Sequence, residues 1–370
     1  MSKTEWKEYK LGDIASFKYG TMPKKDLISL GGQFPIYSGY RIVGSYPEYN
    51  LEQSELIIVA RGVGGTGDVK LSPEKCFLTN LSIVAFLDES IILKKYAYYY
   101  FALNNLRYLD SGSAQSQITI SDLQKVVVPV PPLAEQQRIV KVLSSLDDKI
   151  ELNNAINRNL EEQAQAIFKS WFVDFEPFGG EMPNDWTIGK LSDIADITMG
   201  QSPDGKSYNE NGNGVVFYQG RAEFGWRFPT RRLFTTAPSR MAKKYDTLMS
   251  VRAPVGDLNI ANEDCCIGRG LTAIHSKDNH QSFVHYTIVG LKPKLDMYNG
   301  EGTVFVCFYR DSLNNMEVII PCKRNLDKFE SLISTLDAEI FYRSEENRRL
   351  VILRDSLLPK LISGEMELSC

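Results

Sequence analysis

Residues 131–172 read PPLAEQQRIVKVLSSLDDKIELNNAINRNLEEQAQAIFKSWF. After the two prolines, apolar residues recur at alternating steps of four and three, which is the pattern of a long helix with a heptad seam. A helix from Ile139 to Trp171 would be about 50 Å long at ~1.5 Å per residue, which is the length of a spacer. We expect its seam toward a partner helix to include Leu143, Leu146, Ile150, Asn157 and Leu160.

A second helix with the same seam follows at the end of the chain. Adding 190 to the seam positions gives Ile333, Leu336, Ile340, Asn347 and Leu350, so the polar residues recur near the same place. Two equal helices in one chain favour pairing with each other, and buried asparagines would fix their register at a cost in stability. The alternative is that each amphipathic helix lies on its own domain.

The segments before the two helices also repeat. Trp6–Gly20 reads WKEYKLGDIASFKYG and Trp186–Gly200 reads WTIGKLSDIADITMG, an offset of 180 that becomes 190 by Cys76 and Cys266. Each copy ends in a short apolar strand that runs into proline. The chain therefore divides into a globular domain at 1–130, a helix at 131–176, a second globular domain at 177–321 and a second helix at 322–370.

Short apolar runs separated by Gly, Pro, Asn and Asp predict strands in both globular segments, with a helical stretch near Leu93–Leu109. We expect an α+β fold of two tandem repeats, each a globular domain followed by a long helix. The sequence is 43% hydrophobic and 24% charged, as folded globular proteins are. Because the cysteines form no CxxC pair and no apolar run reaches the ~18 residues of a membrane span, we expect a cytoplasmic protein.

Charge is unevenly distributed along the chain. A net charge of −4 argues against a surface that binds nucleic acid everywhere, but residues 221–244 form a basic patch with one acid, Glu223, and interleaved aromatic residues. We expect the basic patch to contact DNA; the alternative is a solvated face. Its basic residues are Arg221, Arg227, Arg231, Arg232, Arg240, Lys243 and Lys244.

Several residues outside the basic patch are further candidates for DNA contact. Arg61 and Arg252 each follow a predicted strand and precede a tight turn, where an arginine could reach guanine, contact a phosphate or brace the turn. The polar loop 111–117 holds glutamines, which can pair with adenine, although ordinary turns select the same residues. The candidates added here are Arg61, Ser113, Gln115, Gln117, Arg252 and Arg269.

Two motifs that suggest other chemistry lack the context they need. Arg61–Gly67 reads RGVGGTG like a phosphate-binding loop, but Asp68 stands where Lys is required and no helical pattern follows. His275, His280 and His285 recur every five residues without a cysteine or carboxylate to complete a metal site. We therefore expect surface or hydrogen-bonding histidines, no bound metal and no catalytic residue.

Together these features resemble the specificity (S) subunit of type I restriction-modification systems. The resemblance covers essentially the whole chain and rests on KLGDIA from Lys10, KLSDIA from Lys190, the run from Pro131, GQSPDGKSYNENGNGVVFYQG from Gly200 and LRDSLLPKLISGEMEL from Leu353. It implies that each globular segment is a target recognition domain and that the helices pair as an antiparallel coiled coil. It also implies that the protein reads a bipartite, asymmetric DNA site with a fixed gap.

The resemblance further implies a set of partners. These are double-stranded DNA, two methylation (M) subunits that bring S-adenosylmethionine, and restriction (R) subunits that bring ATP and Mg, with no membrane involved. The S subunit itself would be non-catalytic and would direct adenine methylation and cleavage by the complex, a type I site-specific deoxyribonuclease and methyltransferase. Two other classes stay open: a duplicated protein-binding scaffold with a coiled coil, and a nucleotide-binding enzyme that uses the Gly62–Gly67 loop.

Overall fold

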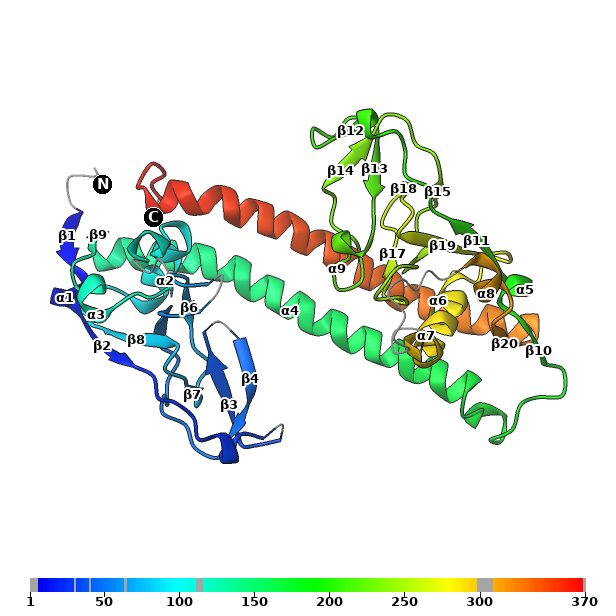
Figure 1. The fold of residues 1–370 in the computed structure, drawn as a ribbon, viewed down its shortest axis with the longest axis horizontal. Helices are drawn as coiled ribbons and strands as arrows, with labels where there is room; N and C mark the ends of the chain where they lie inside the picture. The colour runs from blue at the N-terminus through cyan, green and yellow to red at the C-terminus, as the bar shows by residue number, and fades with distance from the viewer. Residues whose placement is uncertain are drawn as a thin grey trace. The chain divides into compact units, whose positions relative to one another are not determined.

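The structure, a computed structural model, describes residues 6–29, 31–39, 41–62, 65–110, 116–297 and 309–368 (Figure 1). The chain forms two compact units: unit 1 takes residues 1–152 and 347–370, and unit 2 takes residues 153–346. Each unit therefore contains one globular segment and a part of both long helices. Within the described ranges, no helix combines the length and the apolar character that a membrane crossing requires.

In unit 1 the repeated opener folds as a strand, one helical turn and a second strand. β1 (Lys7–Lys10) pairs antiparallel with β9 (Val127–Val130), the strand that leads into the first long helix. The turn α1 (Leu11–Ile14) buries both of its apolar side chains in the core. The sheet that follows has the order β2-β8-β5-β6, with β2 at Ala15–Tyr19, β8 at Ser82–Leu87, β5 at Leu56–Val59 and β6 at Val69–Leu71.

A second, three-stranded sheet of unit 1 has the order β4-β3-β7, with β4 at Arg41–Tyr46, β3 at Phe34–Ser38 and β7 at Phe77–Leu78. The predicted helical stretch at Leu93–Leu109 is shorter than expected. It forms α2 (Lys94–Leu103), and Asn104 caps the end by donating from its backbone and side chain to the Tyr100 carbonyl. The short helices of unit 1 are η2 (Lys25–Leu27), η3 (Arg107–Leu109) and α3 (Ile120–Leu123).

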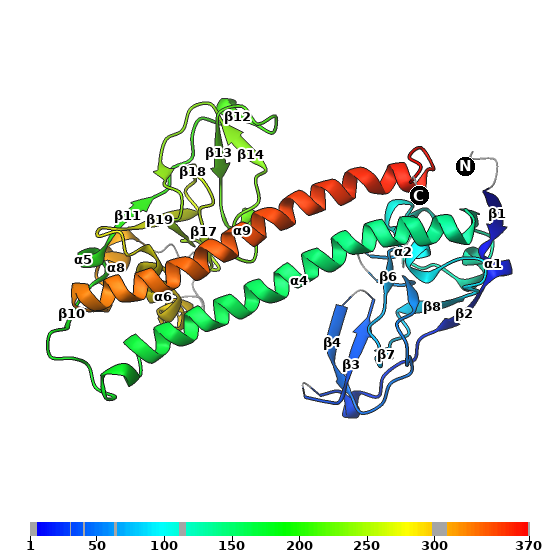
Figure 2. The same cartoon turned by 180° about the vertical axis from the view of Figure 1, so that it is seen from behind.

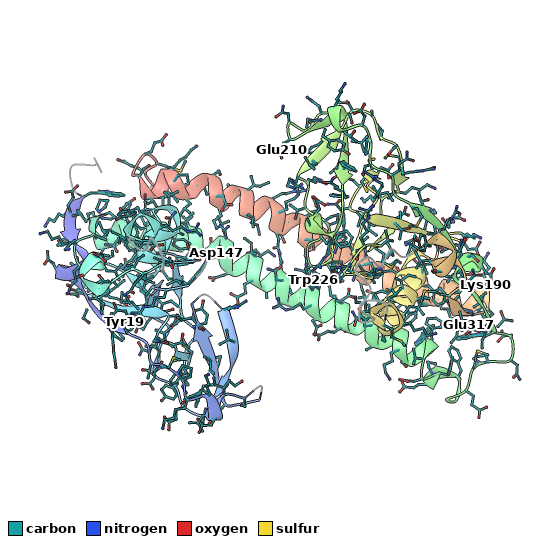
Figure 3. The ribbon with its side chains drawn as sticks, in the orientation of Figure 1. Tyr19, Asp147, Lys190, Glu210, Trp226 and Glu317 are labelled. Carbon is teal, nitrogen blue, oxygen red and sulfur yellow. The ribbon has the colours of Figure 1, made fainter. Side chains whose placement is uncertain are left out.

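Unit 2 repeats this design. β10 (Thr187–Lys190) pairs antiparallel with β20 (Glu317–Ile320), so that Lys190 lies opposite Glu317 (Figure 3). A four-stranded sheet in the order β11-β19-β16-β17 matches β2-β8-β5-β6 of unit 1. Its strands are β11 (Ala195–Met199), β19 (Leu271–Ser276), β16 (Thr247–Ser250) and β17 (Leu258–Ile260), and the turn before it is α5 (Leu191–Ile194).

The other sheet of unit 2 is larger than its counterpart, because the second copy has added strands in its loops. Both copies keep a parallel pair, β3 with β7 and β13 with β18 (Figure 2). The order in unit 2 is β12-β14-β13-β18-β15, with β12 at Tyr208–Asn209, β14 at Leu233–Thr235, β13 at Val215–Tyr218, β18 at Cys265–Ile267 and β15 at Met241–Ala242. Further helices of unit 2 are η5 (Gly205–Ser207), α6 (Gln281–Gly290), α7 (Lys292–Met297) and α8 (Arg310–Asn314).

The predicted long helices are α4 (Leu133–Phe172) and α9 (Lys323–Ile362). In unit 1 Asp147 binds Arg354 and Asn347 donates to the Ile150 carbonyl, while in unit 2 Asn153 binds Glu346 and Asn157 binds Ser344. As the residue number rises in α4 it falls in α9, so the helices are antiparallel within each unit. The predicted pairing of the two helices is therefore confirmed, and all ten predicted seam residues are buried or half-buried.

The start of α4 is fixed on unit 1 by one buried side chain. Gln136 is wholly buried; its Oε1 accepts from the Leu93 amide, and its Nε2 donates to the carbonyls of Ile91 and Pro131. Gln136, the first of the two glutamines in the PPLAEQQ run, thus joins the helix to the segment before α2. At the other end, Phe175, Gly179 and Gly180 adopt positive φ angles, and the chain turns through η4 (Glu176–Phe178) at the predicted boundary between the first helix and the second globular segment.

Candidate nucleic-acid interface

The basic patch begins where β13 ends and passes through the short helix η6 (Arg221–Glu223). The side chain of Glu223 is 2% exposed and uses both oxygens: Oε1 accepts from Nη2 of Arg232 at 2.6 Å, and Oε2 accepts from the Gly220 amide at 3.1 Å. Its backbone carbonyl accepts from the Thr230 amide at 2.8 Å. One buried carboxylate therefore holds both ends of this loop.

Two more arginines reach the same place from distant parts of the sequence. β16 pairs with β19 so that Ser250 lies opposite Leu271, which places the residues after β16 beside those before β19. The segment between β18 and β19 is also held at the end of β13, because the Gly268 amide donates to the Tyr218 carbonyl at 2.8 Å. A Cβ atom on Gly268 would lie 2.8 Å from the Gln219 carbonyl oxygen, so this close approach requires glycine.

These segments enclose a cavity of about 360 Å³, which we call the arginine pocket. Four of the arginines predicted to contact DNA line this pocket. Arg221 and Arg232 come from the basic patch, and Arg252 and Arg269 come from the segments after β16 and before β19. The lining residues are Ser202, Gln219, Gly220, Arg221, Ala222, Glu223, Arg232, Ser250, Arg252, Ala253, Arg269 and Gly270.

The four arginines differ in their charge partners. Arg221 binds Asp257 at 2.9 Å, and Glu223 raises the pKa of Arg232 by its hydrogen bond and its charge. Arg252 and Arg269 are exposed, and among the described residues neither has an ion pair. The pocket is therefore positively charged and rich in hydrogen-bond donors, which suits phosphate oxygens and the acceptor edge of guanine.

The prediction that the whole basic patch contacts DNA is wrong for Arg227. Its side chain is 4% exposed and forms ion pairs with Glu161 of α4 and Asp337 of α9, and it donates to the Tyr286 hydroxyl at 3.2 Å. An arginine whose charge is buried and paired with two carboxylates has no free surface for a phosphate or a base. Arg227 instead joins the basic patch to the helices within unit 2.

The remaining basic residues of the patch lie outside the arginine pocket. Arg231 is paired with Glu263, and the Lys244 ammonium lies 4.5 Å from the centre of the Phe341 ring. Arg240 and Lys243 are exposed near β15, as is Lys244. Trp226, labelled in Figure 3, is the most exposed aromatic residue of the patch at 55%.

In unit 1, Arg61 holds the place that Arg252 holds in unit 2, directly after the third strand of the four-stranded sheet. Arg61 and Gln117 form an isolated antiparallel bridge, so two predicted contacts lie side by side, and the Arg61 guanidinium is 6.0 Å from the centre of the Tyr19 ring. Ser113 and Gln115 lie outside the described residues.

The glycine-rich run after Arg61 joins two antiparallel strands, β5 and β6. The Gly67 amide donates to the Val59 carbonyl, and Asp68 binds Arg107 at 2.9 Å. Because a strand follows the run, it presents no helix N-terminus to a phosphate. This geometry argues against the nucleotide-binding alternative.

The three histidines lie in separate settings. His275 of β19 binds Asp246 at 2.6 Å, His280 precedes α6 and binds Asp327 at 2.8 Å, and His285 of α6 shares a hydrogen bond with Thr247. His280 and His285 are buried and hydrogen-bonded, and all three histidines fit the expectation of surface or hydrogen-bonding side chains. In the part of the chain that the structure describes, no group of three or more His, Cys, Asp or Glu side chains is placed to hold a metal.

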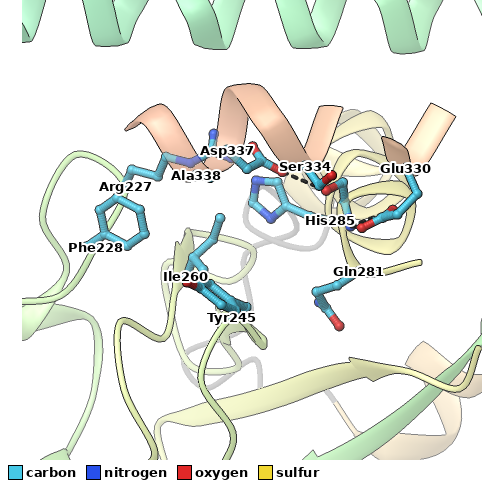
Figure 4. A pocket seen from close by; sticks show the side chains of 11 residues that line it. Arg227, Phe228, Tyr245, Ile260, Gln281, His285, Glu330, Ser334, Asp337 and Ala338 are labelled. Carbon is cyan, nitrogen blue, oxygen red and sulfur yellow. Dashed lines mark hydrogen bonds and ion pairs between the residues drawn. The ribbon is translucent and has the colours of Figure 1, made fainter. Parts of the chain in front are cut away.

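A second cavity of about 200 Å³ lies beside Arg227 in unit 2 (Figure 4). His285 and Glu330 line it, and burial shifts both groups toward neutrality: the pKa of His285 lies well below 6.5, and the pKa of Glu330 is raised. Glu330 accepts from the amides of Ser282 and Phe283 at the start of α6.

The sequence does not predict the carboxylates that pair with arginines of the basic patch, which are Glu223 for Arg232 and Asp337 for Arg227. In the sequence, Glu223 stands out only as the single acid of the basic patch. Asp337 could have been found, because Leu336-Asp337 repeats Leu146-Asp147 at the offset of 190. Asp147 accepts from the Tyr99 hydroxyl and binds Arg354, so in both units this aspartate joins the globular part to the helices.

Comparisons with known proteins agree with this architecture. The sequence model of the type I restriction modification DNA specificity domain matches residues 3–162 and 183–342. The MjaX type I restriction enzyme specificity subunit of Methanocaldococcus jannaschii is 34% identical over 266 residues, which are 68% of this chain and 62% of that protein. This chain therefore matches less than two thirds of that relative's length.

The HindI specificity subunit of Haemophilus influenzae is 22% identical over 459 residues, which cover 98% of this chain and 100% of that protein. Among solved structures, the type I restriction-modification S subunit of M. genitalium has a TM-score of 0.70 at 19% identity, covering 98% of this chain and 97% of that chain. This likeness shows a shared fold.

Proposed function

Because the chain belongs to the type I restriction modification DNA specificity family, we propose that it is the DNA-reading subunit of a type I restriction-modification complex. Each copy reads one half of a bipartite site. The copies differ in their loops, so the two half-sites differ in sequence and the whole site is asymmetric. The observation that carries this proposal is the arginine pocket, in which Arg221, Arg232, Arg252 and Arg269 converge from separate segments.

The pocket supports DNA binding because guanidinium groups bind both phosphates and base edges. In the first copy, Arg61 and Gln117 are the corresponding candidates, and Ser113 and Gln115 precede Gln117 in the sequence. On the second copy, Arg240, Lys243 and Lys244 add positive charge outside the pocket. The net charge of −4 fits a subunit whose affinity for DNA is shared with partner subunits.

The proposed partners are two methylation subunits and the restriction subunits. The methylation subunits supply S-adenosylmethionine for adenine methylation, and the restriction subunits use ATP and Mg to translocate and cut. This chain contributes recognition and catalyses neither step. A duplicated protein-binding scaffold is the alternative, and duplex DNA binding that weakens steeply with salt would distinguish the two.

The test is co-expression of the chain with its methylation subunits, followed by long-read mapping of methylated adenine in the host DNA. A split, asymmetric motif that disappears when the chain is deleted supports the proposal. Adenine methylation that continues unchanged after the deletion would favour the scaffold.

A further inference from the structure

We propose that the arginine pocket contains two kinds of arginine with different tasks: Arg232, held by Glu223, reads a guanine, whereas Arg252 and Arg269 hold the DNA backbone. This inference rests on the proposed function, because it assumes that the second copy binds DNA. It assigns a base to the pocket and a positioning residue to that base.

Arg232 is held at one edge of its guanidinium and open at the rest. Glu223 engages Arg232 through one nitrogen, Nη2, at 2.6 Å, and the arginine side chain is still 54% exposed. A guanidinium has five N–H donors in a rigid fork, so most donors remain free for a ligand. Because Glu223 is also held by the Gly220 amide, Arg232 is fixed before DNA arrives, and little side-chain freedom is lost on binding.

The charge around Arg232 also favours an uncharged ligand. The carboxylate of Glu223 neutralises much of the positive charge of Arg232 and would repel a phosphate close to it. Guanine presents two uncharged acceptors, O6 and N7, whose spacing matches the guanidinium fork. A neutralised and fixed arginine therefore suits guanine better than a phosphate.

Arg252 and Arg269 differ from Arg232 in their charge environment. Arg252 and Arg269 are exposed, and the described residues give neither an ion pair, so they keep their full charge. Unpaired exposed arginines are attracted to phosphates and release counterions when they bind. Arg221 lies between the two kinds, because its partner Asp257 also binds Lys292 at 3.6 Å.

The test uses the complex of the full chain with its methylation subunits and a panel of duplexes with every base pair of the second-copy half-site changed in turn. Arg232→Lys keeps the charge but loses the fork. We expect it to reduce discrimination at one G·C pair by about 10- to 100-fold and to leave the salt dependence of binding unchanged.

The matched variant Arg252→Ala should weaken binding to all duplexes alike and make the slope of log K against log salt shallower by about 1. Arg240→Ala is the control outside the pocket and should leave base preference unchanged. Glu223→Gln should broaden the preference at the same G·C pair as Arg232→Lys; thermal melting of the complex reports whether this variant is folded, and Arg232→Lys carries the test if it is not.

Three results would overturn the inference while leaving the proposed function intact. These are a second-copy half-site without a G·C pair, an Arg232→Lys complex with unchanged base preference, and an Arg232→Lys complex that weakens equally on every duplex. If the unaltered complex shows no sequence preference at all, the proposed function itself fails.

Discussion

Arg227 and Arg232 are five residues apart in the same basic patch, yet only Arg232 faces the arginine pocket. Sequence identifies a guanidinium and its chemistry, but burial depends on residues far away in the chain. Arg227 is buried beside Glu161 and Asp337, which come from the two long helices. The residues next to Arg227 in the sequence do not indicate that contact. At this scale the sequence identifies candidate arginines but does not show which of them are buried.

Arg227→Ala is expected to destabilise unit 2 by about 3–5 kcal/mol, because it leaves two carboxylates without their buried counter-charge. Urea unfolding of the full chain measures the change. Arg231→Ala is the control from the same patch; its ion pair with Glu263 is partly exposed, so a loss of about 0–1 kcal/mol is expected. Equal losses for the two variants would contradict the account.

His285 predicts a pH dependence of stability. Burial, followed by the charge of Arg227, holds its pKa well below 6.5 in the folded protein, so only the unfolded chain takes up this proton. The free energy of unfolding should therefore fall as the pH drops below about 6.5. Glu330 lines the same cavity, and its raised pKa acts in the opposite direction, since the folded state binds that proton more readily.

Comparison with His285→Gln isolates the histidine contribution. Measured by urea unfolding at several pH values between 7.5 and 5.5, the variant should lose less stability on acidification than the unaltered protein. Identical pH dependence of the two proteins would exclude His285 as the cause.

At the scale of elements, the heptad pattern predicted α4, α9 and their seam, since apolar spacing records which face of a helix is buried. It did not reveal how the polar seam positions are satisfied. Asn153 accepts from Arg343 and donates to Glu346, so one asparagine links two charged residues of the opposite helix. The pairing between strands also lay beyond the sequence, because strands such as β13 and β18 are remote in the chain.

Asn157 offers a test of the seam. Its side chain is buried, its Nδ2 donates to Ser344, and among the residues that the structure describes its Oδ1 has no hydrogen-bond partner. Asn157→Leu is expected to raise the free energy of unfolding by about 1 kcal/mol, because it removes an unsatisfied polar atom. Asn159→Leu on the exposed face is the control; destabilisation by Asn157→Leu alone would show that this asparagine stabilises the pair.

At the scale of the whole molecule, the internal repeat predicted the duplicated α+β design from the sequence. The division into consecutive ranges did not foresee that residues 347–370 belong to the same compact unit as residues 1–152. Leu361 and Ile362 are buried in the core of unit 1 together with Leu11 and Leu143. The sequence pattern does not indicate these contacts, because the partners are more than 200 positions apart in the sequence.

Leu361→Ala is therefore expected to destabilise unit 1 by about 2–5 kcal/mol through the cavity it leaves. Hydrogen exchange should quicken in β1, β9 and the start of α4, and remain unchanged in the sheets of unit 2. Ile352→Ala, at an exposed position of the same helix, is the control. Faster exchange confined to unit 2 would contradict the assignment of the C-terminal segment.

If each copy reads its own half of a split site, the two halves can be changed independently. The most direct measurement is to exchange residues 1–130 for the matching segment of a relative, express the chimaera with the methylation subunits, and map methylated adenine by long-read sequencing. One half of the methylated motif should change while the other half stays the same. A motif that is unchanged, or that changes in both halves, would contradict it.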